Sequence, residues 1–191
     1  KTYQDAAEMM KETGLDAVEI HFGHGYDLSQ FISPKTNRRT DAYGGSLENR
    51  MRFGLEVMAA VRKAVGEDFP LIVRMNGNDF MPGGQGRAEL LQYAIALEKW
   101  GADAICVNVG WHEARVPQIV ASVPRGVFAY LARGIREAVD LPVIASHRIN
   151  DPDVARRLIA DHLCDMVAMG RSLIADPYLP EKARSGRERD I

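Results

Sequence analysis

Short apolar runs recur along the chain, and within each run nearly every position is hydrophobic. A near-continuous run of about four to eight such residues is typical of a parallel strand that is buried on both faces. Five strands are predicted in this way, at residues 15–20, 69–74, 104–109, 141–146 and 163–169. Two patterns repeat: Gly14-Leu15-Asp16-Ala17 returns as Gly101-Ala102-Asp103-Ala104, and Phe69-Pro70-Leu71-Ile72 returns as Leu141-Pro142-Val143-Ile144. The repetition indicates one recurring structural unit.

Segments with apolar residues at helical spacing separate these strands. Ser46 is a favourable N-cap for one helix, and Gly66 is suited to end it. Pro152, preceded by Asn150 and Asp151, opens another helix, which runs to about residue 161. The remaining predicted helices precede the first strand, cover residues 90–97 and 127–139, and start at residue 180.

Strict alternation of strands and helices requires a parallel sheet with right-handed crossovers. An open doubly wound sheet and a (β/α)₈ TIM barrel both satisfy this rule. The five predicted strands are too few to close a standard barrel, which takes about 250 residues. If the fold is a barrel, the remaining strand–helix units lie outside these residues.

Composition narrows the class of protein. The apolar content of 46% is enough for a substantial core, and the net charge of −2 gives no basic field for nucleic acid. No apolar run is long enough for a membrane helix, and no signal peptide is visible, so we expect a cytoplasmic protein. The two cysteines, Cys106 and Cys164, lie in strand-like runs and are predicted to be small core residues.

Titratable side chains follow two of the predicted strands. His21, His24 and Tyr26 come at and just after the end of the first strand, and His112 follows the third. The carboxyl ends of parallel strands are where α/β enzymes carry out their chemistry, so these residues are expected to share one active site. Neutral imidazoles would donate hydrogen bonds to a substrate carbonyl, and the phenol would serve as a proton donor.

The spacing His21-x-x-His24 also occurs in metal sites, but here it follows a strand and lacks an adjacent glutamate. A metal-dependent barrel hydrolase built on His21, His24 and His112 is therefore an alternative for which no carboxylate ligand can be placed. The sequence predicts that no metal is bound.

Cationic and small residues follow the other strands. Ser146-His147-Arg148 and Gly170-Arg171 come after the fourth and fifth, where loops of a barrel commonly hold a phosphate. Arg74 ends the second strand, and a guanidinium in a barrel mouth needs an anionic or carbonyl partner. These residues predict a site for a phosphorylated ligand.

Longer motifs resemble a known family. Phe31-Ile32-Ser33-Pro34 and the polar segment Asn37 to Arg50 closely resemble the signature after the fourth barrel strand of Old Yellow Enzyme-type flavoproteins. Those proteins are FMN-bearing (β/α)₈ barrels that reduce activated alkenes. The segments 110–117, 123–126, 148–152 and 174–177 look more specifically like the 2,4-dienoyl-CoA reductase branch.

The resemblance implies roles for residues at matching positions. Tyr26 and His112 match the proton-donor pair of the dienoyl-CoA reductases, whereas His21 and His24 look like the carbonyl-binding imidazoles of enoate reductases. Arg74 matches the arginine at the pyrimidine edge of the flavin. The phosphate-binding loops are matched by Ser146, His147, Gly170 and Arg171, and the thioester contacts by Lys35, Glu113, Ala114, Arg115 and Val116.

On this basis residues 1–191 are expected to be the C-terminal part of an FMN-binding TIM-barrel domain, from the fourth to the eighth strand–helix unit. The implied activity is reduction of an enoyl or dienoyl C=C bond, in a free acid or a CoA thioester, with electrons from NAD(P)H. A 4Fe-4S cluster and FAD belong, in long members of the family, to parts that these residues do not contain. A non-catalytic barrel fragment is the other alternative, and oligomerisation is left open.

Overall fold

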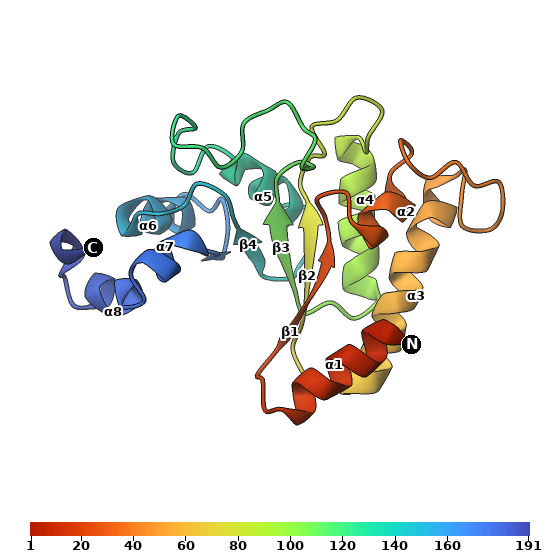
Figure 1. Ribbon diagram of the computed structural model, residues 1–191, viewed down its shortest axis with the longest axis horizontal. Helices are drawn as coiled ribbons and strands as arrows, with labels where there is room; N and C mark the ends of the chain where they lie inside the picture. Colours follow the sequence, from red (N-terminus) through yellow and green to blue (C-terminus); the bar gives the residue numbers. More distant parts are fainter.

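The structure, a computed structural model, describes residues 1–191. Its centre is a single parallel sheet whose strands follow one another in chain order (Figure 1). The strands are β1 (Val18–Phe22), β2 (Leu71–Asn76), β3 (Ala104–Asn108), β4 (Val143–Ala145) and β5 (Met166–Val167). A doubly wound sheet would reverse its strand order at a switch point, so the sequential order identifies five units of a barrel wall. The predicted fold class is confirmed.

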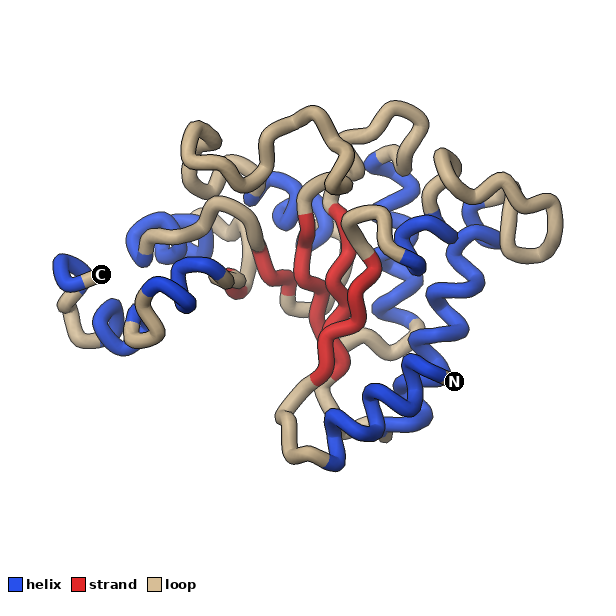
Figure 2. The backbone as a smooth tube through the Cα atoms, in the orientation of Figure 1, coloured by secondary structure: helices blue, strands red, loops and turns tan.

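Helices connect the strands, and consecutive helices pack on one another: α1 on α3, α3 on α4, and α4 on α5. In chain order they are α1 (Thr2–Glu12), α2 (Asp27–Ile32), α3 (Leu47–Val65), α4 (Arg87–Lys99), α5 (Ala129–Arg136), α6 (Pro152–Ala160), α7 (Arg171–Ala175), α8 (Leu179–Arg184) and the short 3-10 helix η1 (Glu188–Asp190). Figure 2 shows the long loops gathered at the end of the molecule where the strands finish. None of the helices has both the length and the hydropathy needed to cross a bilayer.

The predicted helix caps are present. The Ser46 hydroxyl accepts a hydrogen bond from the Asn49 amide at 3.3 Å, and Gly66 ends the same helix with a φ of 82°. The Asp151 carboxylate accepts from the amide of Asp153 at 2.9 Å, with Pro152 in the first turn. The short helices α2 and α7 were not predicted, because neither is long enough to show a helical period.

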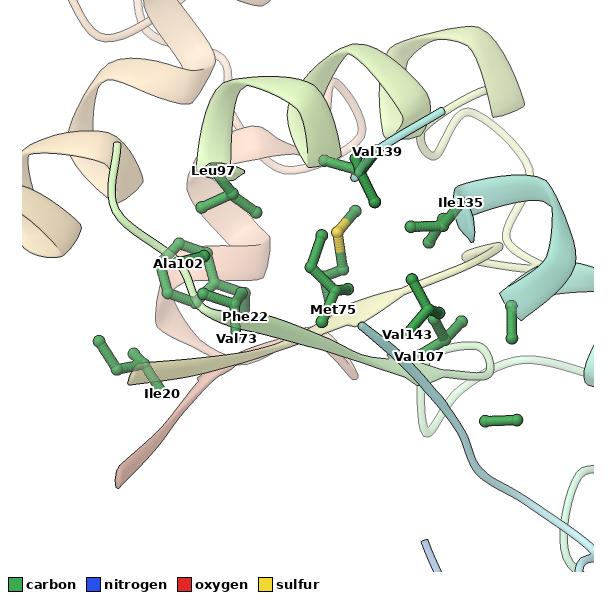
Figure 3. Close-up of a cluster of buried hydrophobic side chains, with 14 of the residues drawn as sticks. Ile20, Phe22, Val73, Met75, Leu97, Ala102, Val107, Ile135, Val139 and Val143 are labelled. Atoms are coloured by element: carbon green, nitrogen blue, oxygen red, sulfur yellow. The ribbon is translucent and has the colours of Figure 1, made fainter. Parts of the chain in front are cut away.

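Alternation along each strand separates an apolar face from a polar one. Figure 3 shows Val73, Met75 and Val107 in the layer between the sheet and the helices, where they meet Leu97 and Ile135. The opposite face of the sheet carries polar side chains, among them Glu19, His21, Arg74 and Cys106. The core therefore lies on the helix side and the candidate chemistry on the inner side of the barrel wall.

The first strand begins later than predicted. Leu15 is 53% exposed, because it belongs to the turn that leaves α1 at Gly14, where φ is 84°. Pairing with β2 starts at Val18, whose amide donates to the carbonyl of Pro70 at 3.1 Å. The strand then continues to Phe22, so His21 lies within it rather than at its end.

Two smaller features complete the fold. Cys106 and Cys164 are both buried and unpaired, as predicted for core residues. The fifth predicted strand, residues 163–169, is reduced to Met166 and Val167, the two residues that pair with β4.

We expect the isolated 191-residue chain to self-associate, because β1 and β5 each have one neighbour and present an open backbone edge. Ile174 and Tyr178 add apolar surface, being 82% and 66% exposed. Light scattering coupled to gel filtration should show oligomers, and a hydrophobic dye should bind strongly. The variant Met166→Lys, with a charge on the β5 edge, should be less associated. A monodisperse parental monomer with a sharp thermal transition would contradict this expectation.

Candidate active site

Tyr26 and His112 form a hydrogen-bonded pair although 86 residues separate them in sequence. Tyr26 is the N-cap residue of α2, in the loop after β1, and His112 lies in the loop after β3. The phenol oxygen Oη and the imidazole Nε2 are 3.1 Å apart, and the rings meet edge to face. The structure thus brings together the two residues that the sequence identified as a proton-donor pair.

His24 lies at the centre of a cluster of imidazoles. Its ring centroid is 5.3 Å from that of His21, 5.2 Å from that of His112 and 5.7 Å from that of His147. The four rings come from the loops or ends of β1, β3 and β4, so three separate strand ends contribute. His21, within β1, and His24, just after it, are therefore both next to the Tyr26–His112 pair.

Burial keeps the central imidazoles neutral. Burial, followed by the neighbouring histidines and Arg74, lowers the pKa of His24 to about 3. Burial and then Arg74 also lower the pKa of His21, and burial with Arg74 and Arg171 lowers that of His147 to about 4. At neutral pH these rings can donate or accept hydrogen bonds, but they do not supply a proton from an imidazolium.

A tight backbone turn places His24. Its φ is 58°, and the next residue, Gly25, has a φ of 84°. A Cβ atom at Gly25 would lie 2.8 Å from the ring of Trp111, so only glycine allows the two loops to approach this closely. An isolated parallel bridge between His24 and Trp111 fixes the contact between the loops after β1 and β3.

The guanidinium of Arg74 is oriented by Asn108 and Glu19 on the neighbouring strands. Its Nε donates to Asn108 Oδ1 at 2.6 Å, and its Nη1 lies 3.4 Å from Glu19 Oε1. No protein group accepts a hydrogen bond from Nη2, and the side chain is partly exposed. The guanidinium is thus oriented by two partners and keeps donor capacity for a third.

A cavity of about 980 Å³ opens beside Arg74, between the loops after β4 and β5. All five residues predicted to bind the cofactor line it: Arg74, Ser146, His147, Gly170 and Arg171. Its size falls within the range of about 300–1,000 Å³ that is usual for small-molecule sites. The sequence predicted these residues from separate loops, and the structure places them around one space.

Two of these residues have their side chains engaged within the protein. Ser146 Oγ donates to the carbonyl of Val107 at 2.5 Å and lies 2.7 Å from His147 Nδ1. With its proton used in this way, Oγ accepts from Nδ1–H, which leaves Nε2 of the ring as an acceptor. Ser146 can therefore offer an anion its backbone amide but not its hydroxyl proton.

His147 and Arg148 both have left-handed backbone conformations, with φ values of 70° and 55°. Consecutive residues outside the common regions of φ and ψ are costly and are found at functional turns. Arg148 Nε donates to the carbonyl of Val123 at 2.8 Å, and Arg171 Nη1 donates to that of Ile119 at 3.2 Å. The long loop after β3 is therefore fastened to both loops that line the cavity.

The predicted substrate residues lie on two loops, and none of them lines the cavity beside Arg74. Glu113, Arg115 and Val116 are exposed and follow directly after His112, and Ala114 is half-buried in the same turn. Lys35 lies on another loop, where its Nζ donates to the carbonyl of Pro82 at 3.2 Å. No hydrogen bond joins Lys35 to residues 113–116, so the structure does not bring the two groups into contact.

Several site residues were not predicted. Asn76, Asp79 and Asn108 form polar contacts beneath the histidine cluster, and Trp111 joins two loops. The polar run Asn76-Gly77-Asn78-Asp79 directly after an apolar strand was a usable signal, because it stands in the same strand-end position as the two histidine loops.

A profile of the NADH:flavin oxidoreductase / NADH oxidase family matches residues 1–190. The chain belongs to this family. Its members use FMN with NAD(P)H as the electron donor. This membership argues against the alternative prediction of a metal-dependent hydrolase.

The chain is 54% identical to a metal reductase of Desulforamulus reducens over 100% of its length and 28% of that protein. It is 42% identical to an NADH oxidase of Thermoanaerobacter brockii, over 99% of this chain and 29% of that one.

Among solved structures, the complex of 2-naphthoyl-CoA reductase with 2-naphthoyl-CoA matches with a TM-score of 0.96 and 40% identity. The match covers 99% of this chain and 29% of the other. The chain therefore spans less than a third of the length of these relatives, and the agreement in fold extends over almost every residue of it.

The residues of the cavity fit the flavin that the family uses. A phosphorylated flavin needs hydrogen-bond donors and positive charge, which Arg74, Arg171 and the backbone after β4 provide. The two carboxylates on the cavity wall are Asp176 and Asp190, and Asp176 is paired with Lys182 at 2.7 Å. The cavity is therefore electrostatically suited to an anionic cofactor.

The lowered histidine pKa values predict acid sensitivity. In the unfolded chain the imidazole of His24 takes up a proton below about pH 6.5, whereas in the folded protein its pKa is about 3. The unfolded state then binds more protons, so stability falls as the pH drops through this window. The thermal midpoint should fall between about pH 7.5 and about pH 5, and it should fall less in His24→Asn, since asparagine does not titrate and tolerates a positive φ.

His162→Asn is the matched control, because His162 also has a positive φ, of 56°, but is exposed. It should lose as much stability on acidification as the parent. An equal loss in parent and His24→Asn would show that another group is responsible.

Proposed function

We propose that the protein is an FMN-dependent ene-reductase, which reduces an activated C=C bond of an enoyl or dienoyl substrate with electrons from NAD(P)H. The observation that carries this proposal is the Tyr26–His112 pair, with 3.1 Å between Oη and Nε2, beside two neutral imidazoles. Reduction of such a bond needs a group that binds the activating carbonyl, a hydride donor and a proton donor. The bound flavin, once reduced, supplies the hydride.

The side chains of this chain supply the other two requirements. His21 and His24 are neutral, so they can donate N–H hydrogen bonds to a carbonyl oxygen as negative charge develops there. Tyr26 delivers the proton to the carbon next to the carbonyl, and His112, hydrogen-bonded to Oη, stabilises the phenolate that is left. Arg74 and Arg171 hold the cofactor at the adjacent cavity.

The proposed substrate class is a conjugated thioester or carboxylate. The exposed turn from Glu113 to Val116 directly follows His112, and Lys35 lies on the loop after α2; we infer that they meet the polar part of such a substrate. The likeness to a 2-naphthoyl-CoA reductase, solved with its CoA thioester, supports the thioester form. The neighbouring rings of His21 and His24 support a carbonyl that is bound through two N–H donors.

Replacing Arg171 tests the cofactor assignment. Arg171→Ala removes a charge-assisted contact to the phosphate, worth roughly 1.5–3 kcal/mol, so the Kd for FMN should rise by about 10- to 150-fold. Fluorescence titration of the flavin-free protein measures this. Arg184→Ala, on an exposed arginine outside the cavity, should leave the Kd unchanged. Unaltered affinity in Arg171→Ala would rule out the phosphate assignment.

Replacing Tyr26 tests the proton donor. Tyr26→Phe removes one hydroxyl and keeps the ring, so flavin binding and flavin reduction by NAD(P)H should be unchanged. Only reoxidation of the reduced flavin by the alkene should slow, by about 10²- to 10⁴-fold, as is usual for loss of a general acid. Stopped-flow measurement of each half-reaction separates the two effects.

His112→Ala should slow the same half-reaction. The double variant should lose less than the product of the single effects, because the two residues act as a unit. A Tyr26→Phe enzyme that is reoxidised by alkene at the parental rate would show that the proton has another source.

A further inference from the structure

Asp79, in the loop after β2, is a buried carboxylate for which the proposed chemistry has no use. It is 1% exposed, and no lysine, arginine or histidine pairs with it. Burial raises its pKa above the usual range, whereas Asn76, the Gln85 amide and Trp111 each lower it. Burying an acidic group without a counter-ion costs free energy, and hydrogen bonds to its oxygens must offset that cost.

Those hydrogen bonds come from the last residue of β2 and from a residue of the loop itself. Asn76 Nδ2 donates to Asp79 Oδ1 at 2.8 Å, and the amide of Gln85 donates to Oδ2 at 2.8 Å. The loop closes tightly around the carboxylate, since a Cβ atom at Gly84 would lie 2.9 Å from Oδ2. The carboxylate therefore fixes which way the Asn76 amide faces: its NH₂ group turns toward Asp79 and its oxygen turns away.

The oxygen of Asn76 holds the loop after β1. Asn76 Oδ1 accepts the backbone N–H of His24 at 3.1 Å. A Cβ atom at Gly23 would lie 2.8 Å from this oxygen, so the backbone before His24 is also pressed against it. Because His24 has a positive φ and Tyr26 follows it by two residues, the direction of the phenol depends on this contact.

The main chain of the same loop holds the loop after β3. The carbonyl of Asp79 accepts the amide of Trp111 at 3.1 Å, and the carbonyl of Asn78 accepts that of Gly110 at 2.8 Å. Trp111 immediately precedes His112. One loop, built around one carboxylate, thus bonds to the backbone next to both members of the Tyr26–His112 pair.

We propose that Asp79, acting through Asn76, is a positioning residue that holds Tyr26 and His112 at hydrogen-bonding distance. The inference rests on the proposed function for its kinetic consequence, whereas its geometric consequence stands independently. Asp79 touches neither substrate nor cofactor in this role. It fixes the orientation of the Asn76 side-chain amide. That amide in turn holds the backbone of His24, whose turn places the phenol of Tyr26.

The substitution Asp79→Asn tests this with almost no change of volume. A carboxylate accepts from both donors, but a side-chain amide has one acceptor oxygen, so its NH₂ group must face either Asn76 Nδ2 or the Gln85 amide. Asp68→Asn, on an exposed aspartate before β2, is the matched control. In crystal structures of the flavin-loaded proteins, the separation of 3.1 Å between Oη and Nε2 should persist in the control and be lost in Asp79→Asn.

The exchange variant with Asn76→Asp and Asp79→Asn provides a rescue. The carboxylate at position 76 then accepts both the His24 amide and the new side-chain NH₂, and the amide oxygen at position 79 accepts from Gln85. Every donor is again satisfied. The Tyr26–His112 distance and the reoxidation rate should return toward the parental values.

Kinetics distinguish positioning from general damage. In Asp79→Asn, reoxidation of reduced flavin by alkene should slow by about 10- to 100-fold, the size expected for misplacement of a catalytic group. FMN affinity and flavin reduction by NAD(P)H should be unchanged. Asp79→Asn should slow the Tyr26→Phe enzyme less than it slows the parent, because the hydroxyl that is positioned has gone and only the effect through His24 is left. If Asp79→Asn does not fold, Asn76→Ala, which cuts the same link, should give this pattern.

Three results would overturn the inference: an unchanged Oη–Nε2 distance in Asp79→Asn, a slowing in the Tyr26→Phe background as large as that in the parent, or an exchange variant without rescue. Failure of the proposed function has a different signature, since the parent itself would then not be reoxidised by any alkene. The crystallographic comparison would still decide whether Asp79 holds the pair.

Discussion

Parallel pairing of β1 with β2 places the Cα atoms of His21 and Arg74 opposite one another, and the site depends on that register. The register is set by packing on the other face of the sheet, where Ile20, Phe22 and Val73 lie against the helices. A slip of β1 by one residue would turn Ile20 and Phe22 inward and move His21 into the core, away from Arg74. The hydrophobic layer therefore determines where the polar groups of the site stand.

Once they are placed, these polar groups form a site rich in hydrogen-bond donors and poor in acids. Burial, together with the positive charge of Arg74, lowers the pKa of both His21 and His24. Arg74 and Arg171 line the cavity, and neutral imidazoles lie beside Arg74. Such a site favours an anionic cofactor at the arginines and a developing oxyanion at the imidazoles.

Local and regular features could be predicted from sequence, whereas contacts between loops could not. The ends of α3 and α6 followed from Ser46 and Asp151, because a cap is decided by residues within one turn. The predicted start of the first strand, at Leu15, was three residues too early. Leu15 is apolar but lies in a turn, and hydrophobicity alone does not show where strand pairing begins.

The candidate site divides along the same line. Polar residues at strand ends identified Tyr26 and His112, and the family resemblance joined them, but their contact spans 86 residues and depends on loop geometry. Asp79 was missed for a related reason. A lone aspartate in a loop is usually solvated, and its burial results from glycine-permitted closure of the loop around it.

The loop after β3 connects the Tyr26–His112 pair with the cavity that is lined by Arg148 and Arg171. It contributes His112 at one end, and farther along it is held by Arg148 and Arg171, at Val123 and Ile119. Between these anchors Val116 and Val120 are exposed, so this stretch is free to vary without disturbing the core. Residues that face solvent can be exchanged without loss of core packing, whereas the strand-end residues His21 and Arg74 are fixed by the register of the sheet. The loop after β3 is therefore the part of the site in which side chains can change while the positions of the strand-end groups are kept.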